Sequence, residues 1–92
     1  MDAYEEIVKK IIKEQEAIIG PLALEQARKV SGLKIDWDKQ KVEFEGDRKE
    51  ILQHLVEQYE HLFGRASIEV CREAAKDFIK NIPPDSIPSL IA

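Results

Sequence analysis

The chain has 92 residues, of which 43% are hydrophobic and 35% are charged, and its formal net charge is −4. This composition is typical of one globular domain with a single modest core rather than of a disordered chain. The two charge signs are interspersed and form no basic stripe, so we predict no nucleic-acid partner.

No apolar run in the sequence reaches the ~18 residues that span a bilayer, and the N-terminus is acidic. We therefore expect a cytoplasmic protein with no signal peptide, no membrane span and no membrane partner. Cys71 is the only cysteine, which excludes an internal disulfide and a cysteine-based metal site within one chain.

The first predicted element is an amphipathic helix that begins after Asp2 and ends at Gly20. Asp2 with Glu5 resembles a capping box, and Gly20 suits a helix C-terminus. Pro21 opens a second helix that we expect to run to about Val30. The first helix presents an apolar face at helical spacing, made of Tyr4, Ile7, Val8, Ile11, Ile12, Gln15, Ile18 and Ile19.

Residues 33–46 change to a period of two, which predicts a β-hairpin. We place its turn around Lys39 and Gln40. That turn pairs Trp37 with Val42, and it pairs Ile35 with Phe44, all on one face.

Residues 47–81 return to the helical period. Asp47 caps the third helix and Gly64 separates it from the fourth, until Pro83–Pro84 prevents continuation. The inner face of the third helix comprises Ile51, Leu52, Leu55, Val56, Tyr59, Leu62 and Phe63. The inner face of the fourth comprises Ile68, Cys71, Ala75, Phe78 and Ile79, and residues 82–92 form an apolar tail.

The predicted fold is a mostly helical α+β domain over residues 1–92, with a β-hairpin between two helical hairpins in the order ααββαα. The first helical hairpin is 1–32 and the second is 47–81. At an offset of 44 residues, four positions are identical in the two hairpins: Glu16 and Glu60, Gly20 and Gly64, Glu25 and Glu69, and Arg28 and Arg72. Small residues also recur on one stripe of the second helix of each hairpin. We interpret this as an internal duplication; two amphipathic helix pairs that resemble each other by necessity are the alternative.

We find no pattern for catalysis, cofactor binding or a metal, and we predict a non-enzymatic protein. His54 and His61 stand seven residues apart on one helix, about 10 Å along its axis, too far to share one ion. Cys71 falls on an inner helix face, where a buried small side chain is the expectation rather than a reactive thiol.

A lone two-stranded hairpin is marginal, so it needs either covering helices or a second hairpin from another copy. We therefore predict a protein-interaction module that binds a protein partner or forms a homodimer. The candidate interface residues are Ile35, Trp37, Val42 and Phe44, with Ile87, Leu90 and Ile91 of the tail second. The tail could instead fold back onto its own helices.

Two other functions remain open at this stage. One is a small-ligand or effector site between the helix pairs, near Gln15, Tyr59 and Cys71. The other is transcriptional regulation through helix–turn–helix-like pairs, which the negative charge disfavours.

The motif "IIGPLALEQA", residues 18–27, resembles the I-G-P-[IL]-A phrase of a small helical domain. That domain is attached to bacterial signalling proteins, including serine/threonine kinases and receptor-like chains, notably from cyanobacteria. A weaker echo follows in the second half, where Arg65 replaces the proline. The resemblance implies a signalling-associated accessory or interaction domain and supplies no catalytic residues.

Overall fold

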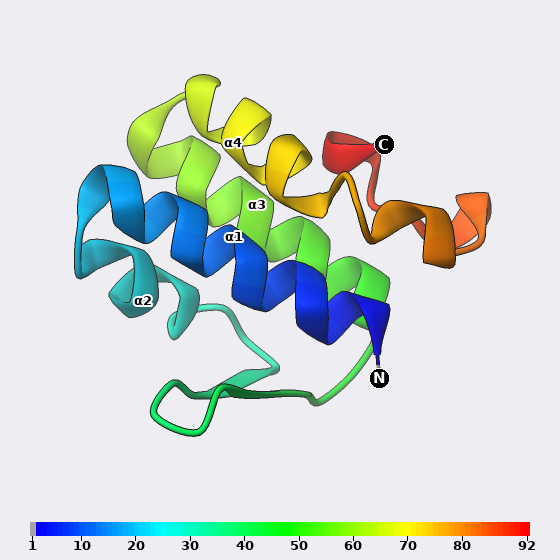
Figure 1. Ribbon diagram of the computed structural model, residues 1–92, viewed down its shortest axis with the longest axis horizontal. Helices are drawn as coiled ribbons and strands as arrows, with labels where there is room; N and C mark the ends of the chain where they lie inside the picture. Colours follow the sequence, from blue (N-terminus) through cyan, green and yellow to red (C-terminus); the bar gives the residue numbers. More distant parts are fainter. Residues whose placement is uncertain (1) are drawn as a thin grey trace.

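The computed structural model describes residues 2–92, which fold into a helical bundle with a small antiparallel sheet (Figure 1). The helices are α1 (Ala3–Ile19), α2 (Leu22–Ala27), α3 (Arg48–Phe63) and α4 (Ala66–Ala75), and the strands are β1 (Leu33–Asp36) and β2 (Lys41–Phe44). Three short 3₁₀ helices, Ile79–Asn81, Pro84–Ser86 and Ser89–Ile91, form the C-terminal segment. The predicted mostly helical α+β fold, with a hairpin between two helix pairs, is confirmed.

Helix boundaries follow local side-chain and backbone chemistry. The carboxylate of Asp2 accepts a hydrogen bond from the Tyr4 amide at 2.8 Å, and Asp47 caps α3 through the Glu50 amide at 3.1 Å. Gly20 ends α1 with a backbone φ of 69°, a conformation that residues other than glycine rarely adopt. These predicted helix ends are confirmed.

Helix α2 is shorter than predicted, because it ends at Ala27 instead of about Val30. The amide of Lys29 donates to the carbonyl of Gln26 at 3.1 Å, and that of Val30 donates to Ala27 at 3.2 Å. These tighter bonds replace the α-helical pattern as the chain turns toward β1. Val30 still reaches the core and is 6% exposed.

The register of the β-hairpin differs from the prediction by two residues. Leu33 lies opposite Phe44, and Ile35 lies opposite Val42. The predicted pairings of Trp37 with Val42 and of Ile35 with Phe44 are therefore both wrong. A shift of two residues keeps each side chain on its expected face, because strand side chains alternate with a period of two.

The cause of this shift is the position of the turn. Trp37 is already in the turn, where its carbonyl accepts from the Gln40 amide at 3.1 Å. Gln40 takes a positive φ of 52°, and the carboxylate of Asp36 accepts from the Lys39 amide at 3.3 Å. The side chain of Asp36 thus starts the turn one residue earlier than the alternation of apolar residues suggests.

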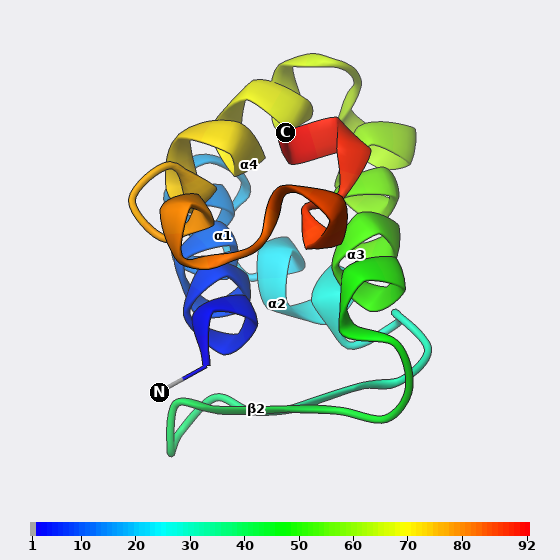
Figure 2. The same cartoon turned by 90° about the vertical axis from the view of Figure 1, so that its right-hand side faces the viewer.

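Helix α1 contacts α4, α2, α3 and the hairpin. The hairpin covers one side of the bundle, whereas α4 and the C-terminal segment lie on the opposite side (Figures 1 and 2). The small residues of the two second helices are buried at these contacts, as their spacing predicts: Ala23, Ala27, Ser67 and Cys71. No helix among residues 2–92 is long and apolar enough to cross a membrane.

Candidate interaction surfaces

The hairpin residues predicted as an interface lie against the chain's own helices. Val42 is buried and is 4% exposed, whereas Ile35, Trp37 and Phe44 are half-buried against the core. The ring of Phe44 meets that of Tyr4 edge-on, with 6.3 Å between centroids. A role for these four residues in binding another chain stays a prediction, and Val42 offers little surface for it.

The C-terminal segment folds back onto α3 and α4. Ile91 is buried, and Ile87 and Leu90 are half-buried against the core. The backbone of Leu90 is held from both sides: its amide donates to the side chain of Gln53 at 3.3 Å, and its carbonyl accepts from Arg72 at 3.1 Å. Of the two alternatives for the tail, the structure shows docking within the chain.

The polar atoms proposed for a ligand pocket are occupied by protein partners. Gln15 is 1% exposed, and its amide nitrogen donates to the carbonyl of Ser67 at 3.2 Å and contacts the Cys71 sulfur at 3.6 Å. The hydroxyl of Tyr59 donates to the carbonyl of Ala23 at 2.6 Å. These groups join helices to each other instead of lining an open site.

Burial also removes the chemical reactivity of this cluster. Desolvation raises the pKa of Cys71 to about 11, and the hydrogen bond from Gln15 offsets this only in part. Desolvation likewise raises the pKa of Tyr59 above its usual range. A thiol that is buried and protonated near neutral pH is a poor nucleophile. Cys71 therefore acts as a packing residue, as expected.

The two histidines are both exposed on α3. Among residues 2–92, no group of three or more His, Cys, Asp or Glu side chains is placed to hold a metal ion. Both stand on the one continuous helix α3, as predicted, seven residues apart.

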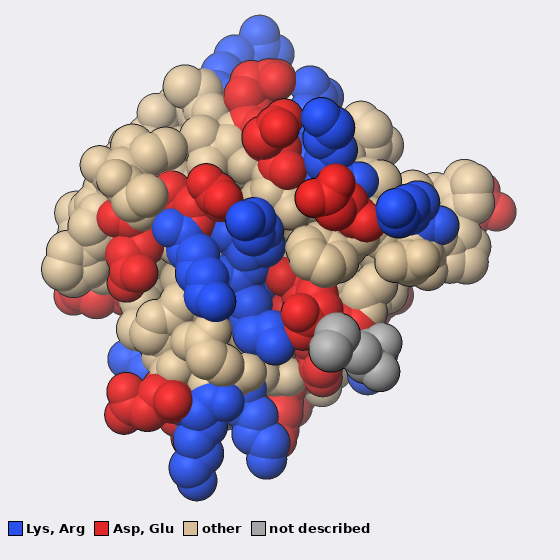
Figure 3. All heavy atoms as spheres, viewed as in Figure 1, with Lys and Arg blue, Asp and Glu red and all other residues tan. Residues whose placement is uncertain are grey.

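An exposed apolar surface lies at the end of the bundle where both helical hairpins turn. Ile18 is 64% exposed, and Leu22 and Leu62 are each 45% exposed. We call these three residues the apolar end. Figure 3 shows this left-hand end largely free of Lys and Arg, with acidic groups around it.

The sequence alone placed Ile18 and Leu62 on the inner faces of their helices, which is wrong. Each stands in the last turn of its helix, close to the glycine that ends it.

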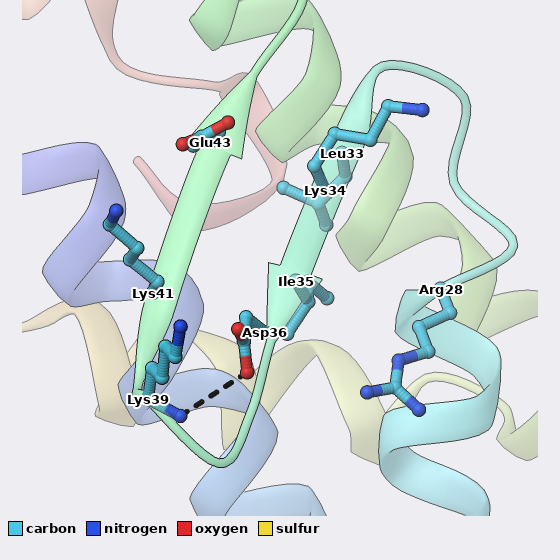
Figure 4. Close-up of a pocket in the computed structure, with 8 residues that line it drawn as sticks. All are labelled: Arg28, Leu33, Lys34, Ile35, Asp36, Lys39, Lys41 and Glu43. Atoms are coloured by element: carbon cyan, nitrogen blue, oxygen red, sulfur yellow. Dashed lines mark hydrogen bonds between the residues drawn. The ribbon is translucent and has the colours of Figure 1, made fainter.

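A groove lies along β1 and over the outer face of the hairpin, and it extends from Arg28 on one side of β1 to Lys41 and Glu43 of β2 on the other (Figure 4). Its volume is about 500 Å³. The side chain of Arg28, at the end of α2, reaches toward β1 from the far side of the groove. The other lining residues are Leu33, Lys34, Ile35, Asp36, Lys39, Lys41 and Glu43. Sequence reasoning missed Arg28, because only the fold brings it beside the hairpin.

Comparison with known proteins found no matching family model, no similar curated protein and no similar solved structure.

Proposed function

We propose that this chain is a non-enzymatic protein-interaction module that associates with a second copy of itself through the apolar end. The resemblance of residues 18–27 to a domain of signalling proteins supports an accessory role in signalling. Docking of a different protein on the same surface is the alternative outcome of the test.

The observation that carries the proposal is the exposure of Ile18, Leu22 and Leu62 at one end of the bundle. Single exposed apolar residues are common and need no explanation, whereas a group of them favours a binding surface. Removing apolar surface from water contributes roughly 25 cal/mol per Å². The surface is small, so we expect a weak association in the micromolar to millimolar range.

A second copy is the favoured partner because two of the three residues of this surface, Ile18 and Leu62, are equivalent positions of the two helical hairpins. Ile18 and Leu62 are separated by the 44-residue offset of the two repeated sequences. The same offset relates two hydrogen bonds: Gln15 to the carbonyl of Ser67, and Tyr59 to the carbonyl of Ala23. Each hairpin thus binds the other in a reciprocal manner.

This reciprocity supports our proposal that the chain arose by duplication of a helical hairpin. Gly20 and Gly64 add to that support, since both have positive φ, and their amides donate to Glu16 at 2.9 Å and to Glu60 at 2.8 Å, respectively. A two-fold interface uses the same surface on both copies, and the apolar end offers each copy the equivalent apolar residues Ile18 and Leu62 for such a contact.

The proposal is tested by light scattering of the protein from micromolar to millimolar concentration. We expect the molar mass to rise toward that of a dimer, and the double variant Ile18→Lys, Leu62→Lys to remain a monomer. Both positions are exposed, so the free energy of unfolding should change little. Asn81→Lys adds a like charge at an exposed site away from the apolar end and serves as control.

A wild-type protein that remains monomeric throughout this range would contradict self-association. An unchanged dimer mass in the double variant would contradict the assignment of the surface. If the wild type is a monomer, capture of a partner by the wild type but not by the double variant would support docking of a different protein.

A further inference from the structure

The outer edge of β1 is an unpaired strand edge. The Glu45 amide donates to the carbonyl of Gly32 at 2.7 Å, so this pair is a hydrogen-bonded pair of the hairpin ladder. In an antiparallel ladder, bonded and non-bonded pairs alternate. Lys34 and Asp36 therefore bond to β2, whereas the backbone groups of Leu33 and Ile35 point outward into the groove.

One of these outward groups already has a partner. The Leu33 amide donates to the carbonyl of Val30 at 3.2 Å, within the connection between α2 and β1. The amide and carbonyl of Ile35 and the carbonyl of Leu33 remain, and no hydrogen bond to them occurs from the part of the chain that the structure describes. These are the groups with which an added strand would pair.

The groove is bordered on the side opposite β1. Figure 4 shows that Arg28 and the connection of residues 28–32 border the groove on the side opposite β1. Strands in a sheet lie about 4.8 Å apart, and the groove of about 500 Å³ is of the size that binds peptides and small ligands. A whole second sheet, as in a dimer that pairs two hairpins, would meet this connection.

The charge of the groove selects the occupant. Four of its lining residues are basic, Arg28, Lys34, Lys39 and Lys41, and two are acidic, in a chain whose net charge is −4. Arg28 and Lys39 form no ion pair among residues 2–92. The ammonium of Lys34 forms one long ion pair, with its Nζ 3.9 Å from a carboxylate oxygen of Glu45. One of the two carboxylates, that of Asp36, is engaged by the turn.

We propose that this groove binds an acidic, extended segment of a partner protein, which adds to β1 as a third strand. The backbone of Ile35 supplies the hydrogen bonds, and Arg28 and Lys34, which both stand on the groove side of β1 in Figure 4, attract the carboxylates. The same lysines discourage pairing with neutral or basic strands, a common protection of exposed sheet edges. This surface is separate from the apolar end.

The test uses a synthetic peptide of alternating Glu and Val and follows binding through the fluorescence of Trp37. Trp37 is the only tryptophan, and it lies half-buried in the turn that ends β1. We expect saturable binding that weakens with salt, and no binding of the matching Lys–Val peptide. In Arg28→Glu the affinity should fall by about tenfold or more, whereas Lys80→Glu, the same charge change at an exposed site outside the groove, should leave it unchanged.

Strand addition is tested with a Glu–Val peptide of the same charge that is N-methylated on the edge that would pair. This peptide should not bind, because it cannot donate to β1. Equal binding of the methylated peptide, or equal loss of affinity in Arg28→Glu and Lys80→Glu, would overturn the proposal. Tighter binding of a short oligonucleotide than of the acidic peptide would also overturn it, since the groove would then recognise phosphate.

Discussion

The hydroxyl of Tyr59 in α3 donates a hydrogen bond of 2.6 Å to the backbone carbonyl of Ala23 in α2. Both residues are fully buried. The bond joins the second helical hairpin to the first, 36 residues earlier in the chain. It fixes where α3, which carries Leu62 of the apolar end one helical turn after Tyr59, lies against α2.

Loss of this hydrogen bond should destabilise the fold. In Tyr59→Phe the ring still fills its site, but the buried carbonyl of Ala23 loses a donor, and we expect the free energy of unfolding to fall by about 1–2 kcal/mol. Urea denaturation measures this. Tyr4→Phe is the matched control, because its hydroxyl donates to Ser86 at 2.7 Å in a half-buried position. A larger loss in Tyr4→Phe would contradict the central role of Tyr59.

Stability should decrease at alkaline pH because of Cys71 and Tyr59. Burial raises the pKa of Cys71 from 9.0 to about 11, so the folded chain keeps the thiol proton to higher pH than the unfolded chain. The associated stability is complete below pH 9 and is lost as the pH rises to about 11. Each group that ionises only on unfolding lowers the free energy of unfolding by roughly 1.4 kcal/mol per pH unit.

Unfolding measured from pH 8 upward checks this slope in the wild type and in Cys71→Ala. The variant should lose stability less steeply, although Tyr59, whose pKa burial also raises, continues to contribute. Equal slopes in the two proteins would mean that the thiol ionises as easily in the folded chain as in the unfolded one.

Two glycines should respond differently to the same substitution. Gly20 and Gly32 both have positive φ, 69° and 86°, so alanine is strained at each, by roughly 1–2 kcal/mol. A Cβ at Gly20 meets nothing within 4 Å, whereas at Gly32 it lies 2.7 Å from the backbone oxygen of Glu45 and 2.9 Å from Ile51. Gly32→Ala should therefore be clearly less stable than Gly20→Ala in thermal unfolding. Equal melting temperatures would contradict this packing around Gly32.

Substitutions in the hairpin separate folding from association. Val42→Ala removes buried methyl groups, and we expect a loss of about 1–2 kcal/mol in the free energy of unfolding. Trp37→Ala should also reduce stability, because Trp37 packs against the core, while the molar mass at high concentration stays that of the wild type. A Trp37→Ala protein that is monomeric but keeps its stability would mean that the hairpin, and not the apolar end, forms the interface.

The sequence predicted most of the fold because its signals are local. Asp2, Asp47, Gly20 and Gly64 define helix ends through their own side chains or backbone freedom, and helix periodicity identified nearly all core residues. The hairpin register was wrong because Asp36 starts the turn one residue early. The alternation of apolar residues along the two strands does not reveal such a side-chain hydrogen bond.

The candidate surfaces were harder to predict, because they depend on how distant segments meet. Leu62 continues the apolar pattern of α3, yet it is 45% exposed in the folded chain. Arg28 looks like an ordinary surface residue until the connection to β1 places it beside the strand edge. Exposure at an end and proximity across a groove are tertiary properties.

The most direct test of self-association through the apolar end is a dilution series followed by amide NMR spectra, from millimolar to micromolar protein. We predict that the concentration-dependent shifts concentrate around Ile18, Leu22 and Leu62 and disappear in the Ile18→Lys, Leu62→Lys variant. Spectra that do not change with concentration, or shifts confined to Ile35 and Trp37, would contradict the proposal.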